Sequence, residues 1–133
     1  FSPEGDYIAY TSDEQGQFDV YVQPYPPTGE KWRISTRGNC EEPVWSPTLK
    51  ELDYRNDRKW MVVSYSTSPT FNHSLPSVLF EGDYVNVGGR SYDVSPDGQR
   101  FLLLKPVEEA STISELHVVQ NWFEELKRLA PTE

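Results

Sequence analysis

A short pattern, an apolar residue followed by Ser and Pro, occurs three times in this chain. The copies are Phe1-Ser2-Pro3, Trp45-Ser46-Pro47 and Val94-Ser95-Pro96. The second proline follows the first by 44 residues, and the third follows the second by 49. A repeat at a nearly fixed period constrains the fold strongly, because each copy forms the same local unit and packs against its neighbours.

Each Ser-Pro pair is followed by a turn and then by a strand pattern. Proline fixes φ and ends strand pairing, while the glycines of Glu4-Gly5 and Asp97-Gly98 supply the positive φ of a tight turn. Residues 7–11 and 101–105 then read as strands of aromatic, aliphatic and β-branched residues. The second copy has Thr48-Leu49-Lys50 in place of the acid and glycine, so we expect its turn to differ.

The repeat length predicts an all-β fold. Units of roughly 40–50 residues with four short strands are typical of β-propeller blades. We therefore expect a single domain over residues 1–133, a β-propeller fragment of about three four-stranded antiparallel blades. Blade one spans residues 1–40, blade two 41–82 and blade three 90–119, and the Ser-Pro turns join inner strands to second strands. Further strands are expected at 18–22, 32–35, 51–55, 60–65, 78–81, 91–94 and 113–119.

The end of the chain has a different pattern. Trp122, Phe123, Leu126 and Leu129 follow one helical face, and Asn121 is a suitable N-cap. A short C-terminal α-helix is therefore predicted at residues 121–129.

Composition excludes several classes of partner. The 133 residues hold 21 acids and 12 bases, a formal charge of −9, without a basic patch. We therefore expect no nucleic-acid partner, because phosphate binding needs clustered Lys and Arg. No apolar run approaches the roughly 20 residues of a membrane-spanning helix, so no membrane insertion is expected. Cys40 is the single cysteine, which excludes an intrachain disulfide.

The Ser-Pro-Glu/Asp-Gly units, with residues 8–14 and Val20-Tyr21-Val22, resemble the WD40-like repeats of bacterial TolB-type propellers. The resemblance is closest to the propeller that ends many bacterial eukaryotic-like serine/threonine kinases, which often finish in a segment similar to residues 118–126. It implies a bacterial protein and leaves the compartment open between cytoplasm and periplasm. The chain lacks a Gly-rich phosphate loop, a His-Arg-Asp triplet and an Asp-Phe-Gly triplet, so no kinase segment is present.

The resemblance also implies where a partner would bind. Residues that enter the innermost strands of such a propeller lie near the channel mouth, and here these are Glu41, Glu42, Arg90 and Tyr92. The aromatic residues at strand positions are expected to pack between blades: Trp45, Trp60, Tyr10, Tyr21 and Tyr54. Residues 86–90 are interpreted mainly as a turn, with anion binding by backbone amides as the alternative.

No catalytic, metal or cofactor site is expected. The two histidines lack motif context: His73 lies in a predicted loop and His117 in a predicted strand. No Gly-x-Ser-x-Gly elbow is present. Asp13, Glu14 and Asp19 surround one turn without the spacing of a calcium loop, so we interpret them as solvated carboxylates.

These observations favour a non-catalytic protein- or peptide-binding propeller module. The alternatives are a small-molecule- or ion-binding propeller, a hydrolase-associated fragment, or a piece that only completes a larger assembly. Three blades are too few for a ring of the usual 4–8. We therefore expect either a homodimer with 3 + 3 blades, meeting through blade faces, or further blades supplied by a longer polypeptide.

Overall fold

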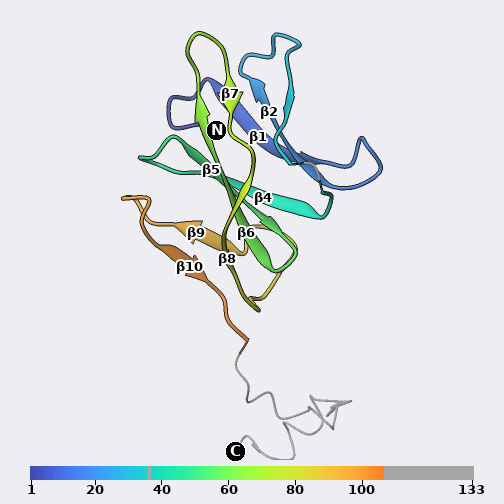
Figure 1. Ribbon diagram of the computed structural model, residues 1–133, viewed down its shortest axis with the longest axis vertical. Helices are drawn as coiled ribbons and strands as arrows, with labels where there is room; N and C mark the ends of the chain where they lie inside the picture. The colour runs from blue at the N-terminus through green and yellow to red at the C-terminus, as the bar shows by residue number, and fades with distance from the viewer. Residues whose placement is uncertain (36, 107–133) are drawn as a thin grey trace, which may run out of the picture.

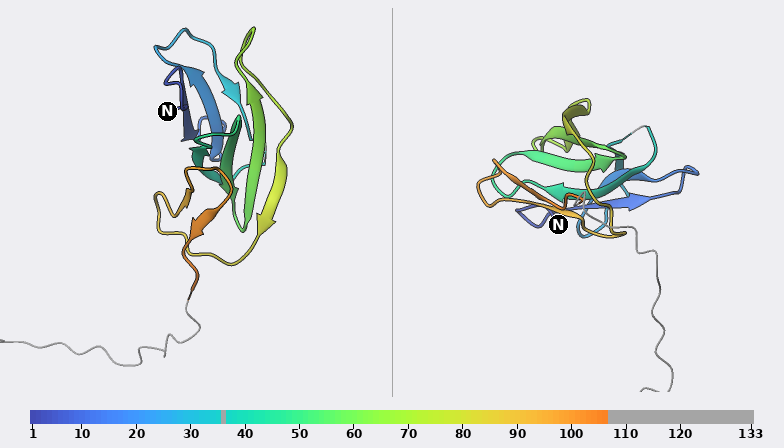
Figure 2. Two further views of the ribbon diagram at one scale, coloured as in Figure 1. Left: turned by 90° about the vertical axis from the view of Figure 1, so that its left-hand side faces the viewer. Right: turned by 90° about the horizontal axis from the view of Figure 1, so that it is seen from below.

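The computed structural model describes residues 1–35 and 37–106 of the chain, and this part consists of antiparallel strands without a helix (Figure 1). The all-β prediction is therefore confirmed for these residues. The predicted strand at 113–119, which contains His117, and the predicted helix at 121–129 lie outside them. The strands form three sheets, which Figure 2 shows from two further sides.

The first sheet follows the first Ser-Pro copy and has the order β1-β2-β3. Its strands are β1 (Tyr7–Ser12), β2 (Asp19–Pro24) and the short β3 (Trp32–Arg33). The turn between β1 and β2 is polar, and the register places Tyr10 opposite Tyr21. β1 lies at the edge of this sheet.

The second sheet contains a run of four antiparallel strands. They are β4 (Cys40–Trp45), β5 (Glu51–Asn56), β6 (Lys59–Ser66) and β8 (Ser77–Glu81), each paired with the one before it. The predicted strands at 51–55, 60–65 and 78–81 are thus present. The long connection before β8 also holds the two-residue strand β7 (Asn72–His73), which pairs with the end of β6.

The third sheet contains β9 (Tyr92–Val94) and β10 (Phe101–Leu103), paired antiparallel. The second and third Ser-Pro turns therefore each join one strand to its antiparallel neighbour, β4 to β5 and β9 to β10. Trp45 pairs with Leu52, and Val94 pairs with Phe101. The strands on either side of these two turns are therefore paired in the same register.

All three turns close with one shared hydrogen bond. The backbone N–H of the serine donates to the carbonyl of the fifth residue after it, at 2.8 Å from Ser2 to Tyr7, 2.9 Å from Ser46 to Glu51 and 2.8 Å from Ser95 to Arg100. Three segments far apart in sequence thus fold into one local structure, which is what an internal repeat requires.

The second turn differs inside this frame, as its sequence predicts. In the first and third copies the glycine N–H donates to the serine carbonyl, at 2.9 Å for Gly5 and 2.8 Å for Gly98. In the second copy the N–H of Leu49 donates instead to the hydroxyl of Ser46, at 3.2 Å. Leu49 replaces a glycine there, so the closing contact moves from the backbone to the serine side chain.

The third turn lies directly against the second. Gly98 has φ +72°, and a Cβ at this position would stand 2.9 Å from the Ser46 hydroxyl and 3.0 Å from that of Thr48. Only glycine meets both the left-handed backbone and this close approach without strain.

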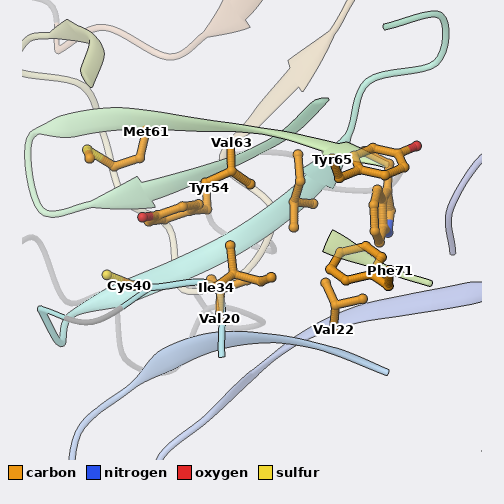
Figure 3. Close-up of a cluster of buried hydrophobic side chains, with 11 residues drawn as sticks. Val20, Val22, Ile34, Cys40, Tyr54, Met61, Val63, Tyr65 and Phe71 are labelled. Carbon is orange, nitrogen blue, oxygen red and sulfur yellow. The ribbon is translucent and has the colours of Figure 1, made fainter. Parts of the chain in front are cut away.

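One hydrophobic cluster fills the space between the first and second sheets (Figure 3). Val20 and Ile34 from the first unit face Tyr54 and Val63 from the second sheet. The other buried members are Val22, Cys40, Trp45, Leu52, Met61, Tyr65 and Phe71. Because side chains alternate along a strand, Leu52 and Tyr54 of β5 reach this cluster together.

A second cluster covers the opposite face of the second sheet, where β9 and β10 pack. Its centre is Trp60, which is fully buried and lies 5.1 Å from the ring of Phe80 and 5.9 Å from that of Tyr92. Trp45, Tyr54 and Trp60 thus pack between sheets. Tyr10 and Tyr21 instead stack on each other at 5.9 Å, outside both clusters.

The interpretation of Asp19 as a solvated carboxylate is wrong. Asp19 is fully buried, and it pairs with the Arg33 guanidinium and accepts hydrogen bonds from the Ser35 hydroxyl at 2.8 Å and the Gly38 N–H at 3.3 Å. Asp19 is the first residue of β2. Its side chain contacts the segment that follows β3, through Ser35 and Gly38. Glu14, in the same turn, remains at the surface in a 2.5 Å ion pair with Lys31.

Candidate functional site

A cavity of about 530 Å³ lies between the first unit, β4 and the segment that precedes β9. The first unit contributes Phe1, Thr11 and Phe18 to its walls, β4 contributes residues 41–45, and the segment before β9 contributes residues 88–90. The lining combines aromatic and aliphatic side chains with two carboxylates and one guanidinium. Such a mixture of apolar walls and few polar groups is typical of a binding site.

A β-bulge in β4 directs the side chain of Glu42 toward Ser91. The register with β5 shifts between Glu41 and Val44, and Glu42 has φ +55°, an uncommon backbone conformation for a residue with a side chain. Its Oε2 accepts hydrogen bonds from the N–H of Ser91 at 2.9 Å and from its hydroxyl at 2.6 Å. The bulge therefore ties β4 to the segment that leads into β9.

The other carboxylate oxygen of Glu42 has no such partner. Among residues 1–35 and 37–106, Oε1 is buried without a hydrogen bond. A buried acceptor without a partner is costly, because it loses its contacts with water and gains none. Glu42, which also lines the cavity, thus keeps one buried acceptor without a partner.

The four residues predicted near the channel mouth lie together in the structure. Glu41 and Glu42 line the cavity from β4, and Arg90 lines it from the opposite wall. Arg90 is exposed and forms an ion pair with Asp93. Tyr92 lies behind them in the second cluster, where its hydroxyl donates to the Glu42 carbonyl at 2.8 Å and burial raises its pKa.

The glycine-rich segment before Arg90 supports its interpretation as a turn. The N–H of Gly88 donates to the side chain of Asn86 at 3.1 Å. This bond uses one of the backbone amides that an anion would need. Gly88 and Gly89 instead form a side-chain-free stretch of the cavity wall.

Arg55 was not anticipated from the sequence, although it shapes the site. It is 7% exposed, and its guanidinium donates to the carbonyls of Tyr84 at 3.1 Å and Val85 at 3.2 Å, and to the Ser91 hydroxyl at 3.3 Å. The same group lies over the ring of Trp60, 5.1 Å from its centroid. Arg55 thereby fixes the segment that carries residues 88–90 to the second sheet.

Asp53 was also missed. It alternates with Leu52 and Tyr54 on β5, so it faces the second cluster, where it is 3% exposed. Burial, with a smaller effect from the charge of Glu51, raises the pKa of Asp53 to about 7. No local signal in the sequence indicates its burial, because β5 alternates the apolar Leu52 and Tyr54 with polar residues.

Among residues 1–35 and 37–106, the remaining reactive side chains form no cluster. Nδ1 of His73 lies 2.9 Å from the Ser74 carbonyl, and burial raises the pKa of the Cys40 thiol. In the part of the chain that the structure describes, no group of three or more His, Cys, Asp or Glu residues is placed to hold a metal ion. That part likewise contains no helix suited to crossing a membrane.

Comparisons with protein-family models, with curated proteins and with solved structures find no match for this chain. The geometry itself defines an antiparallel all-β protein with a mixed apolar and acidic cavity between its sheets.

Proposed function

We propose that the three Ser-Pro units are successive blades of a TolB-type β-propeller, and that the protein is a non-catalytic module that binds a protein or peptide. The shared turn hydrogen bonds support the repeat. The antiparallel run β4, β5, β6 and β8 has the number and order of strands that a blade requires. The two hydrophobic clusters occupy the positions expected between neighbouring blades.

The cavity carries the binding proposal. Phe1 and Phe18 are 68% and 47% exposed beside it, so apolar surface is available to a ligand. Glu41 and Glu42 face the same space, whereas the charge of Arg90 is already balanced by Asp93. A peptide that offers an apolar side chain together with a Lys or Arg satisfies both features.

A random peptide library displayed on phage tests this proposal. We expect the purified chain to select peptides that combine an apolar residue with Lys or Arg. Glu41→Gln removes one cavity charge while keeping the shape of the side chain, and should weaken binding of the selected peptides about 3- to 10-fold. The matched control is Glu81→Gln, since Glu81 is exposed on β8 and does not line the cavity. Selection of nothing above background, or equal losses in both variants, would contradict the proposal.

We further propose that the chain assembles through blade faces. Leu102 and Leu104 are 73% and 52% exposed on and after β10, and a second copy that covers them would complete a ring of 3 + 3 blades. Light scattering should then give a mass near twice 15.3 kDa at micromolar concentration. Leu102→Glu should return the mass to that of one chain. A monomeric wild type would contradict the homodimer.

A further inference from the structure

A second cavity, which we call the Arg37 cavity, has a volume of about 300 Å³ and lies on the face of the second sheet that packs against the first unit. Its walls are the residues before β4, one end of the strands β4, β5 and β6, and the start of β8 with the residues before it. Cys40, Tyr54 and Met61 belong both to these walls and to the first hydrophobic cluster, and Figure 3 shows them on one side of that cluster. Among the described residues, the Arg37 cavity shares no lining side chain with the cavity beside Glu41.

The charged side chains that line the Arg37 cavity are positive. They are Arg37 and Lys59, and no Asp or Glu of the described residues lines it. Within the part of the chain that the structure describes, six Lys and Arg side chains form ion pairs, and these two do not. Glu81 stands directly opposite Lys59 on β8 without forming such a pair. Because the whole chain has a formal charge of −9, two cations left without a carboxylate favour an anionic ligand at this place.

Asn56 fixes the segment that carries Arg37. Its side-chain amide donates hydrogen bonds to the carbonyl of Gly38 at 2.7 Å and to Sγ of Cys40 at 3.3 Å. The N–H of Gly38 in turn donates to the buried carboxylate of Asp19 at 3.3 Å. The backbone beside Arg37 is therefore held from two sides, and a site that is already ordered loses less entropy when a ligand binds.

The opposite wall of the Arg37 cavity is apolar. Met61 is buried on β6, and the register places Val78 of β8 opposite it. Leu75 and Val78 line the cavity and are 89% and 52% exposed, so a ligand that covers them removes apolar surface from water. The volume is at the lower end of the range of about 300–1,000 Å³ for ligand pockets, so the ligand is small.

We propose that the Arg37 cavity binds a small carboxylate with an apolar tail, its carboxylate bound by Arg37 and Lys59 and its tail lying against Met61, Leu75 and Val78. Arginine forms paired hydrogen bonds with a carboxylate, and lysine adds a compact positive charge. The apolar wall beside the two cations favours such a ligand over an inorganic anion. The proposal is independent of the peptide-binding function, which depends on the other cavity.

Octanoate, below the concentration at which it forms micelles, tests the proposal by NMR titration of the purified chain. We expect the methyl signals of Met61, Leu75 and Val78 to move and to saturate. Octanol has the same tail without the charge and should bind about tenfold more weakly, because it cannot form charged hydrogen bonds with Arg37. Inorganic phosphate should not displace octanoate at equal concentration.

Two substitutions test the two ends of the ligand. Arg37→Gln keeps a polar side chain without its charge and should weaken octanoate binding about tenfold. Leu75→Ser removes apolar contact area at an exposed position and should weaken it about threefold. The matched control is Arg58→Gln, which should leave the affinity within twofold. Arg58 is exposed in the turn next to Lys59, pairs with Asp83 and does not line the cavity.

The contrary outcomes are distinct. Equal losses in Arg37→Gln and Arg58→Gln would show a response to overall charge, and equal affinities for octanoate and octanol would show that the carboxylate is not recognised; either result would overturn the proposal. Displacement by phosphate would overturn the tail contacts, and signal changes confined to Phe1 and Phe18 would place the ligand in the other cavity. The comparison of octanoate with octanol uses the unaltered chain, so it decides even if a variant does not fold.

Discussion

Replacing Asp53 by Asn should raise the free energy of unfolding by about 4 kcal/mol at pH 8 and change it little at pH 4. The carboxyl is buried between the second and third sheets, and its pKa rises from an ordinary value of 3.8 to about 7. The folded state therefore binds more protons than the unfolded state between these two values. Stability from this group is present at low pH and is lost as pH rises through 7. Asparagine has no charge to bury at any pH.

Urea unfolding between pH 4 and pH 8 checks this expectation. The wild type should lose stability with rising pH relative to Asp53→Asn, with most of the divergence below pH 7. Asp6→Asn serves as the control because Asp6 is exposed. Parallel curves for the wild type and Asp53→Asn would show that the folded protein keeps this carboxyl charged.

A change of similar size and opposite sign is expected from Asp19→Ala, which should lower the free energy of unfolding by about 3 kcal/mol. Asp19 is fully buried, and its removal leaves the Ser35 hydroxyl and the Gly38 N–H without their acceptor. It also leaves the Arg33 guanidinium without its partner, although partial exposure of Arg33 to water moderates that cost.

The control for this variant comes from the neighbouring turn. Glu14→Ala breaks an exposed ion pair with Lys31, and such pairs contribute about 0–1 kcal/mol. Chemical unfolding at pH 7 should therefore separate the two variants clearly. Losses of equal size would mean that the buried carboxylate contributes no more than a surface one.

Local chemistry explains which parts of the fold were predictable. The Ser-Pro turns and the strands after them follow from φ restriction, glycine and alternating side chains, all of which act within a few residues. The bulge at Glu42 and the burial of Asp19 depend on contacts with residues distant in sequence, Ser91 for the first and Ser35 for the second. No local pattern contains those contacts.

The candidate site divides in the same way. The resemblance to TolB-type propellers pointed to Glu41, Glu42, Arg90 and Tyr92 as residues that enter innermost strands. The structure places the first three on one cavity and joins Tyr92 to Glu42 by a hydrogen bond. Asp53 and Arg55 were missed because their burial requires the third sheet to cover the far face of the second. The alternation of side chains along β5 shows that the strand has two faces. It does not show that other sheets cover both of those faces.

The contact of Gly98 with the second turn has a consequence for the geometry of the assembly. Gly98, in the third turn, lies against side chains of the second turn. Because packed atoms are nearly incompressible, this contact limits how the third sheet is angled against the second. A side chain at position 98 would have to displace Ser46 and Thr48, and with them the second turn relative to the third. One glycine near the rim therefore sets how closely the two turns can approach each other.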